Sequence, residues 1–366
     1  MVDLQSYMTE SIRRIMGNAY RSVLGNPREA RFVLRMQQAF HRSERRRRTL
    51  TETEGLQVPP FLIASIATAC NLQCKGCYAR KNGIAAETPT KPTLSPEQWG
   101  RIFAEAEKLG VNFCLLAGGE PLTRRDLLEQ AAAVKDIIFP VFTNGTMIGA
   151  TYTEFFRKHL NMVPVISLEG NAADTDTRRG EGIYRRVMTA MDTLHGEKIF
   201  FGTSITVTTD NYRRVTSEDY LRELHDKGCR LVFYVEYVPF DESTRHLAFG
   251  DQEVAEMEQL VDQARRRFDD IVFLSFPGDE KSLDGCLAAG RGFFHIGPDG
   301  SAEPCPFSPY SDTNVARDGL RAALHSPLFT RLRDANTGSW QHTGGCTLYE
   351  HRDEVEQMLG LDKGNV

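Results

Sequence analysis

The strongest constraint on the fold is an alternation between Pro60 and Ser275, where short apolar, β-rich runs are separated by longer segments of helical periodicity. Repeated strand–helix units of this kind build a parallel sheet with right-handed crossovers. Six consecutive units predict an α/β fold of the partial (β/α)6 TIM-like barrel type. The active site is then expected in the loops after the carboxyl ends of the strands. The expected strands are 61–67, 112–116, 137–142, 163–168, 200–207 and 231–238.

Helices are expected between these strands. The clearest one starts at Ser95, which can cap the helix, because Pro96 suits the first helical position and Gln98 can close a capping box. The expected helices are 95–109, 125–135, 184–194, 217–226 and 251–267.

The first 57 residues differ in composition from the barrel. Apolar side chains recur at helical spacing over 12–24 and again over 32–40, on either side of Asn26-Pro27. Eleven arginines lie between Arg13 and Arg48, against two acidic residues. We expect a basic helical hairpin that packs on the main domain with a solvated arginine face. Contact with an acidic peptide, a nucleic acid or a membrane surface is the alternative.

The last 90 residues form a third region, expected to be a small α+β domain. The turn sequence Gly297-Pro298-Asp299-Gly300 lies between the runs 293–296 and 301–305, which predicts a β-hairpin. The resulting domain organisation is 1–57, 58–275 and 276–366.

Composition narrows the class of protein. Apolar residues are 41% and charged residues 25%, which is typical of a globular chain. The net charge of −5 gives no global positive field, so nucleic acid is not expected as a partner. The start of the chain lacks the features of a signal peptide, and the longest apolar run, 61–70, is too short to span a bilayer. We therefore expect a cytoplasmic protein, whose eight cysteines serve metal or redox chemistry rather than disulfides.

Three cysteines follow the first expected strand. Cys70, Cys74 and Cys77 form a C-x3-C-x2-C arrangement, followed by Tyr78. Three thiolates in so short a loop can hold three irons of a four-iron cluster and leave the fourth iron open. Zinc is less favoured, because a structural zinc site usually takes four ligands in two pairs and no second pair lies nearby.

This motif resembles the signature of the radical S-adenosylmethionine (radical SAM) superfamily, which ends in an aromatic residue as it does here at Tyr78. The resemblance implies that the open iron of a 4Fe-4S cluster binds the amino and carboxylate groups of S-adenosylmethionine. It also implies reductive cleavage of the cofactor to a 5′-deoxyadenosyl radical, which abstracts a hydrogen atom from the substrate. A reducing partner such as a flavodoxin or a ferredoxin would supply the electron.

A second motif supports the first. Gly118, Gly119, Glu120 and Pro121 follow the second expected strand, where paired glycines allow close backbone approach and a carboxylate can meet a cation. The segment resembles the family's GGEP motif, which receives the methionine ammonium of the cofactor.

Later strand ends carry further candidates for cofactor binding, because hydroxyl, amide and carboxylate groups there can hold a ribose or a carboxylate. Ser167 to Gly170 resembles the family's strand-four motif, with a glutamate in place of the usual aspartate. Each of these groups could instead satisfy local backbone. The candidates are Thr143, Asn144, Ser167, Glu169 and Asn211.

The tail holds Cys286, Cys305 and Cys346, with the expected hairpin between the first two. This resembles the auxiliary-cluster tail of the family, the SPASM or shorter twitch module, and implies a second iron–sulfur cluster. Three cysteines fit a single twitch-type cluster. Tyr349 stands where a paired cysteine is common, so the fourth ligand is expected to be Glu350, His351, a tyrosinate or an open site. Cys114 and Cys229 are expected to be buried free thiols.

The sequence thus predicts a radical SAM enzyme with one auxiliary cluster. Relatives with such tails often modify peptides, so peptide modification is the favoured function. Oxidation or other modification of a small molecule or lipid is the alternative, and a non-enzymatic electron carrier or iron–sulfur sensor is the rival. Catalytic acids and bases stay unassigned.

Overall fold

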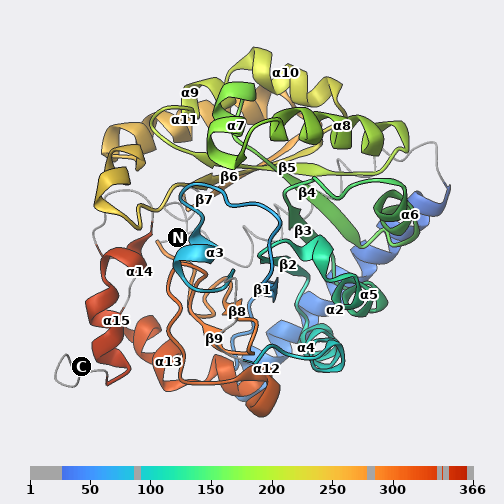
Figure 1. The fold of residues 1–366 in the computed structure, drawn as a ribbon. Helices are drawn as coiled ribbons and strands as arrows, with labels where there is room; N and C mark the ends of the chain where they lie inside the picture. The colour runs from blue at the N-terminus through green and yellow to red at the C-terminus, as the bar shows by residue number, and fades with distance from the viewer. Residues whose placement is uncertain (1–26, 86–91, 278–284, 336–339, 341–345, 361–366) are drawn as a thin grey trace.

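A computed structural model of the chain describes residues 27–85, 92–277, 285–335, 340 and 346–360. Its centre is one curved sheet with the strand order β7-β6-β5-β4-β3-β2-β1-β8-β9, and helices cover its outer side (Figure 1). Neighbouring strands from β7 to β8 pair in parallel, and β9 pairs antiparallel with β8. The strands are β1 (Phe61–Ala67), β2 (Phe113–Gly118), β3 (Phe139–Thr143), β4 (Met162–Leu168), β5 (Gly202–Val207), β6 (Leu231–Glu236), β7 (Val272–Phe276), β8 (His295–Ile296) and β9 (Ala302–Glu303).

The barrel prediction is confirmed, with one addition. Each of the six expected strands begins within two residues of its observed start, because most residues of these strands are buried and most are apolar. The addition is a seventh parallel strand, β7, which follows the last predicted helix and pairs with β6 along its whole length. Its apolar run, Ile271 to Leu274, is a strand signal that the sequence interpretation did not use.

Helices connect the parallel strands on the outside of the sheet. Ser95 accepts a hydrogen bond from the Gln98 N–H, and the Gln98 side-chain oxygen accepts one from the Ser95 N–H, so the predicted capping box is present. The barrel helices of seven or more residues are α4 (Pro96–Leu109), α5 (Arg125–Ala133), α6 (Ala150–Lys158), α7 (Ala172–Arg179), α8 (Ile183–Gly196), α10 (Glu218–Asp226) and α11 (Asp251–Arg267); the short ones are α3 (Tyr78–Lys81) and α9 (Tyr212–Val215).

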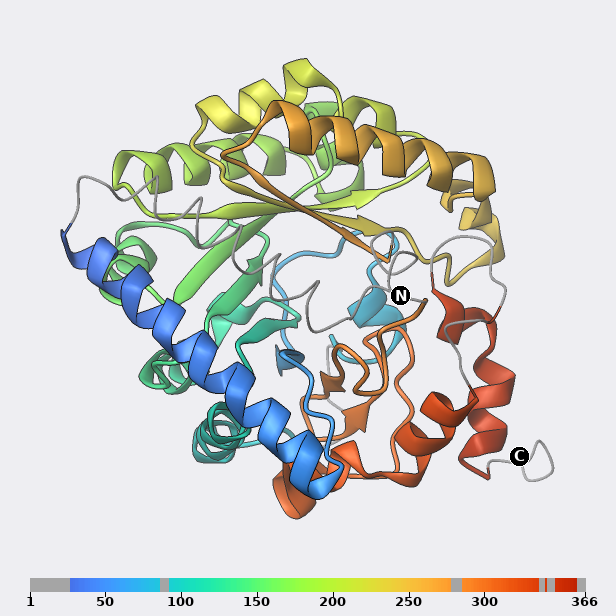
Figure 2. The same ribbon diagram turned by 180° about the vertical axis from the view of Figure 1, so that it is seen from behind.

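The N-terminal region contributes one long helix, α2 (Pro27–Glu54), which crosses one side of the molecule (Figure 2). It buries Val33, Met36 and Phe40 against the barrel, as the expected 32–40 helix required. Arg28, Arg35 and Arg46 donate hydrogen bonds to main-chain carbonyls at or just beyond the C-terminal ends of α6, α5 and α4. A cation is favourable there, because the last carbonyls of a helix lack partners.

These three arginines therefore dock α2 on the barrel, which supports the expected packing on the main domain for this part of the region. The expected 12–24 helix lies outside the described residues, so the hairpin stays a prediction. No helix in the described part of the chain is long and apolar enough to cross a bilayer.

The tail contributes two strands to the edge of the barrel sheet. The predicted hairpin is confirmed as β8 and β9, and β8 pairs with β1 through Ile63 and Ala64. Helices α12 (Val315–Leu324), α13 (Pro327–Asp334), α14 (Thr347–Glu350) and α15 (Arg352–Met358) complete the tail.

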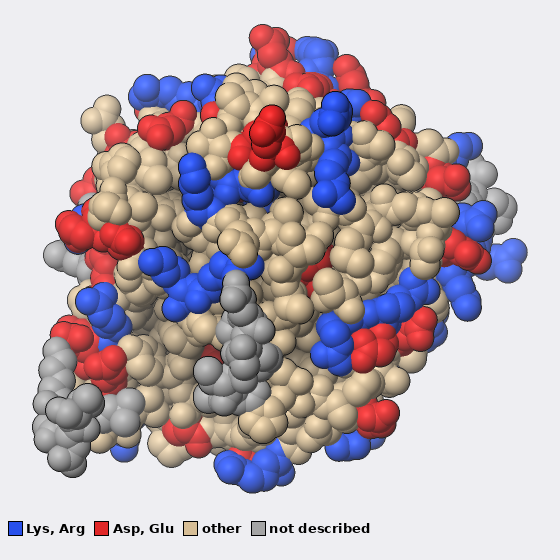
Figure 3. All heavy atoms as spheres, viewed as in Figure 1, with Lys and Arg blue, Asp and Glu red and all other residues tan. Residues whose placement is uncertain are grey.

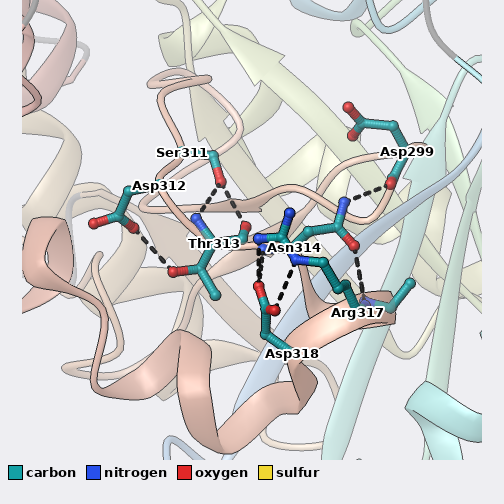
Figure 4. A network of polar contacts seen from close by, with 8 residues as sticks. Asp299, Ser311, Asp312, Thr313, Asn314, Arg317 and Asp318 are labelled. Carbon is teal, nitrogen blue, oxygen red and sulfur yellow. Dashed lines mark hydrogen bonds and ion pairs between the residues drawn. The ribbon is translucent and has the colours of Figure 1, made fainter.

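A polar network holds the hairpin turn against α12 (Figure 4). Asn314 caps α12 through its side-chain oxygen and donates from its amide nitrogen to the Asp299 carbonyl in the turn. Arg317 and Asp318 pair on the first turn of the helix, and Ser311 shapes the loop before it. The turn that places β9 is thereby fixed.

Candidate functional site

The first cysteine motif lies in the loop after β1, beside the end of β2. Main-chain hydrogen bonds join the two segments, from the Gly119 N–H to the Ala67 carbonyl and from the Glu120 N–H to the Ala69 carbonyl. A Cβ at Gly118 or Gly119 would overlap these same carbonyl oxygens. The paired glycines are therefore required because the chain leading into Cys70 passes directly against them. The sequence had suggested the approach of a ligand as the reason.

Glu120 lies at the centre of this junction and is only 1% exposed. Its carboxylate accepts hydrogen bonds from the Leu122 N–H (3.0 Å), the Thr143 hydroxyl (2.7 Å) and the Asn144 N–H (2.8 Å). Burial raises the pKa of Glu120, and these three donors oppose that rise. The carboxylate thus joins the ends of β2 and β3. That it also binds the ammonium group of the cofactor stays a prediction.

The end of β3 also holds the cysteine loop. The Asn144 amide donates to the Asn71 side chain (2.8 Å), and Asn71 donates to the Thr146 hydroxyl (2.8 Å). Asn71 stands between Cys70 and the rest of the motif and was not singled out in the sequence. Thr143 and Asn144 therefore have structural partners here, which is the alternative that the sequence left open.

An arginine pair from the end of α7 faces the cysteine loop. Arg179 donates to the Glu169 carboxylate (2.5 Å), and Arg178 lies 3.5 Å from the other oxygen of that carboxylate. The Arg179 guanidinium is also 4.0 Å from the Cys74 sulfur. Burial raises the pKa of Cys74, and the Arg179 cation lowers it. Sequence reasoning missed both arginines, since no motif marks them and only the fold of α7 brings them to the loop.

The remaining predicted cofactor residues lie around the same end of the barrel. Ser167 lines a cavity below the cysteine loop, and Pro121 begins the short 3-10 helix Pro121–Thr123 after Glu120. The Asn211 amide donates to the Glu169 and Thr206 carbonyls and accepts from the Thr208 N–H. Its side chain therefore supports the ends of β4 and β5.

Tyr78 connects the first motif to the tail. Its ring packs edge-on against Phe307, with 5.3 Å between centroids, and Phe307 follows Cys305 by two residues. In the same place the Asn82 amide donates to the Pro306 carbonyl (2.7 Å).

The structure brings the three tail cysteines together, although 60 residues separate the first from the last. All three are buried, and Cys305 interacts with both Cys286 and Cys346. Burial and the neighbouring Cys346 raise the pKa of Cys305, whereas the pKa of Cys346 is lowered by a hydrogen bond from Cys305. Cys114 and Cys229 are buried free thiols, as predicted.

The candidate fourth ligands follow Cys346 on and after α14. The Tyr349 ring packs against Phe240 at 4.7 Å, and the His351 ring lies 4.8 Å from that of Trp340. Glu350 is exposed. The fourth ligand stays a prediction.

Each cysteine group can be tested for its fit to a metal. No set of three or more His, Cys, Asp or Glu side chains among the described residues is placed to hold a single ion. Three thiols from one short loop, or three gathered in one buried place, instead suit a cluster that spreads its sulfur ligands over several irons. Beside the first group, one oxygen of the buried Glu169 accepts no hydrogen bond in the described structure, which leaves an acceptor for a ligand hydroxyl.

A second buried polar group joins the barrel to the tail and was not predicted. His295 on β8 is fully buried and contacts the Ser65 hydroxyl on β1 (2.7 Å) and the Glu303 carboxylate on β9 (2.6 Å). Ser65 and His295 are 230 residues apart, so no local pattern could reveal the pair. His295 therefore has a structural role here, because it joins β1, β8 and β9 through its two ring nitrogens.

The barrel encloses a cavity of about 670 Å³ below the cysteine loop. Cys74, Cys77, Arg178 and Arg179 line one end of it. On the face drawn in Figure 3, several basic side chains stand near the centre, while acidic side chains lie mostly toward the rim. A cluster in the loop would therefore face the cavity at an end that carries positive charge.

Comparisons with known proteins agree with this site. The family model described as "Radical SAM superfamily" matches residues 64–221. The AdoMet-dependent heme synthase of Methanosarcina barkeri is 25% identical over 320 residues, covering 80% of this chain and 89% of that protein. The PqqA peptide cyclase of Rhizobium meliloti is 27% identical over 320 residues, covering 82% and 79%.

A solved structure shares the fold. Streptococcus suis SuiB bound to its precursor peptide SuiA has a TM-score of 0.62 and 17% sequence identity, covering 90% of this chain and 79% of that one.

Proposed function

We propose, from the premise that this chain belongs to the radical SAM superfamily, that it modifies a peptide by abstracting a hydrogen atom from it. The 4Fe-4S cluster and S-adenosylmethionine supply the 5′-deoxyadenosyl radical when they are bound. The observation that carries the proposal is the junction of Cys70, Cys74 and Cys77 with the Gly118–Pro121 segment at the open end of the barrel cavity.

The residues of this chain have separate tasks in that junction. The three thiolates would hold the cluster, with Asn71 and Asn144 fixing the loop that carries them. Glu120 can accept one more donor besides its three present partners, which suits the ammonium of the cofactor. The Glu169 oxygen that accepts no hydrogen bond, 3.5 Å from the Arg178 guanidinium, suits a ribose hydroxyl.

Arg178 and Arg179 would neutralise anionic groups at the same place. A 4Fe-4S cluster held by three thiolates, and the carboxylate of the cofactor, both add negative charge beside Cys74. A nearly buried guanidinium 4.0 Å from that sulfur offsets part of it. Cys286, Cys305 and Cys346 would hold the auxiliary cluster.

Peptide modification is supported by the names of similar proteins, among them the PqqA peptide cyclase, and by the fold shared with SuiB bound to a precursor peptide. The reaction also needs one electron at a time, which a flavodoxin or a ferredoxin would supply. A small-molecule substrate is the second candidate, favoured by the similarity to a heme synthase over most of that protein.

The test is formation of 5′-deoxyadenosine by the anaerobically reconstituted protein on reduction. We expect the wild-type protein to form it, and the variant with Cys70, Cys74 and Cys77 all changed to Ala to form none and to lose about four irons per chain. Cys114→Ala is the matched control, because it removes a thiol that is buried elsewhere in the barrel. Continued 5′-deoxyadenosine formation by the triple variant would refute the assignment.

A further inference from the structure

The cysteine loop has an inner and an outer face. Cys74, Gly76 and Cys77 line the barrel cavity, whereas Lys75, which lies between them in the sequence, is not part of its wall. Asn71 and Lys75 are exposed to solvent. The segment that would hold the first cluster therefore lies between the cavity and the surrounding water.

Lys75 carries the charge of the outer face. Its main-chain N–H donates a hydrogen bond to the Arg178 carbonyl (2.8 Å), which fixes this part of the loop against the end of α7. Its ammonium group has no hydrogen-bond or ion-pair partner among the described residues. Lys75 thus presents an unshared positive charge to the solvent from within the cysteine motif.

The chain on either side of Lys75 is also basic. The segment 68–85 contains three cations and no acidic residue, although the net charge of the whole chain is −5. Arg80 donates to the Leu72 carbonyl in the loop (2.7 Å). The Lys81 side chain is 50% exposed, and its only acidic partner among the described residues is Asp241, at 3.9 Å. The loop segment is therefore positive within a negative protein.

A further cation reaches the loop from α8. The exposed Arg186 donates to the Thr146 carbonyl (2.9 Å), and the Thr146 hydroxyl accepts a hydrogen bond from Asn71 beside Cys70. Figure 3 shows basic side chains near the centre of this face, where Figure 1 places α3 just after the loop. We call the following residues the basic loop surface: Lys75, Arg80, Lys81 and Arg186.

We propose that the basic loop surface docks an acidic electron-carrier protein that reduces the loop cluster; this inference rests on the proposed function. One electron leaves the reduced flavin or iron–sulfur centre of the carrier and enters the cluster, and no atom is transferred. Opposite charges on two surfaces steer their encounter and fix their orientation. The carrier would then meet the protein at the segment that holds the cluster.

The exposure of the two cysteine groups favours this point of entry. Cys70, Cys74 and Cys77 are partly exposed, whereas the three tail cysteines are buried. An electron donor has to come close to the cluster that it reduces, and a protein can approach the loop more closely than the tail. An acidic peptide substrate fits this surface less well, because its reacting group has to enter the cavity on the other face of the loop.

The test measures how fast reduced flavodoxin, the probe carrier, reduces the clusters of the full-length, reconstituted protein. Freeze-quench electron paramagnetic resonance follows the reaction without S-adenosylmethionine. We expect Lys75→Glu/Lys81→Glu to lower the second-order rate constant roughly tenfold or more at low salt, and Lys75→Gln/Lys81→Gln to have a smaller effect. Salt should slow the wild-type reaction toward the rate of the charge-reversed variant, because the Debye length falls from about 10 Å at 0.1 M to about 3 Å at 1 M ionic strength.

Two controls separate docking from damage to the cluster. Photoreduced 5-deazariboflavin is a small neutral reductant, so it should reduce the wild-type protein and all variants at the same rate. Lys108→Glu/Lys158→Glu makes the same change in charge in the last turns of α4 and α6, at the opposite end of the barrel from the cysteine loop. Both lysines are exposed, and this variant should keep the wild-type rate with flavodoxin.

Three results would overturn the proposal. The first is an equal rate with flavodoxin in the wild-type protein and in Lys75→Glu/Lys81→Glu, and the second is an equal loss in the control variant. The third is an unchanged rate with flavodoxin together with lost binding of a decaglutamate peptide, which would show that the surface takes an acidic peptide. Failure of 5-deazariboflavin to reduce the wild-type protein would instead refute the cluster and the proposed function, so the two failures are distinguishable.

Discussion

The two cysteine groups of this protein occupy opposite environments. Cys70, Cys74 and Cys77 are partly exposed, lie in one loop and have charged or polar neighbours in Glu120 and Arg179. The three tail cysteines are buried, come from segments up to 60 residues apart and lie in the main hydrophobic core. A cofactor and a substrate can reach the first group through the barrel cavity, whereas the second is enclosed.

This difference suggests different duties for two clusters of similar chemistry. The loop site has the Glu120 carboxylate, an arginine pair and a Glu169 oxygen that accepts no hydrogen bond, which are groups that a charged cofactor needs. The tail site is buried. Burial lowers the polarity around an iron–sulfur cluster and thereby changes its reduction potential. We therefore expect the tail cluster to transfer electrons, not to bind the substrate at an open iron.

The largest expected effect is the loss of iron when the three tail cysteines are removed. Changing Cys286, Cys305 and Cys346 together to Ala should remove about four of about eight irons per chain. The loop cluster should remain, because its ligands and supports lie on β1, β2, β3 and α7. Iron analysis and reductive formation of 5′-deoxyadenosine would measure both consequences.

Two results would count against this division. An unchanged iron content would mean that the tail thiols are ordinary core residues. Loss of iron in Cys229→Ala would mean that a fourth cysteine serves the second cluster, although Cys229 is buried beside Thr203 in the barrel.

The next prediction tests whether the barrel and the tail unfold as one unit. His295→Leu leaves the buried Glu303 carboxylate without its imidazole partner and leaves the Ser65 hydroxyl without a hydrogen bond. Breaking a buried pair in this way costs about 3–5 kcal/mol of the free energy of unfolding. Denaturant unfolding, followed by circular dichroism, should show this loss in a single transition shared by barrel and tail.

The double variant His295→Leu/Glu303→Leu is the control, since it removes the unpaired carboxylate and should recover part of the stability. A separate early transition of the tail in His295→Leu would show instead that the hairpin and the barrel unfold independently.

Much of the fold was predictable because its signals are local. Buried parallel strands are continuous apolar runs, and the capping box at Ser95 needs only four adjacent residues. The Cys70 and Glu120 motifs are local as well, so their positions at the ends of β1 and β2 followed from the strand pattern.

What the sequence could not provide are pairings across long separations. Arg179 reaches Cys74 over 105 residues, and the pairing of β8 with β1 joins the tail to the start of the barrel. Neither contact has a pattern of its own, because each depends on where the whole sheet places two distant segments.

A smaller effect sharpens the description of the loop site. Glu120→Gln removes the charge of a carboxylate in a closed place, and losing a charge-assisted hydrogen bond costs about 1.5–3 kcal/mol. We expect the affinity for S-adenosylmethionine to fall roughly tenfold to over a hundredfold, as measured by equilibrium binding. The iron content of both clusters should not change. An unaltered affinity would mean that Glu120 serves only to join β2 and β3.

The smallest expected effect is on the contact between the cysteine loop region and the tail cysteines. Asn82→Ala removes the hydrogen bond from the residue just after α3 to the carbonyl of Pro306 beside Cys305. One such bond contributes about 0.5–1.5 kcal/mol, so both clusters should persist with a modest loss of stability. Hydrogen exchange should then rise around 305–308, where the Ser308 N–H bonds to the Cys305 carbonyl.

Asn71→Ala is the matched variant, because it removes an amide of the cysteine loop whose partners among the described residues, Asn144 and Thr146, lie in the barrel. Its effect on exchange should be confined to the loop and the end of β3. If both variants raised exchange equally around 305–308, the loop and the tail would communicate through the barrel as a whole. If only Asn82→Ala did so, the short path through α3 and Pro306 would be the connection between an accessible site and an enclosed one.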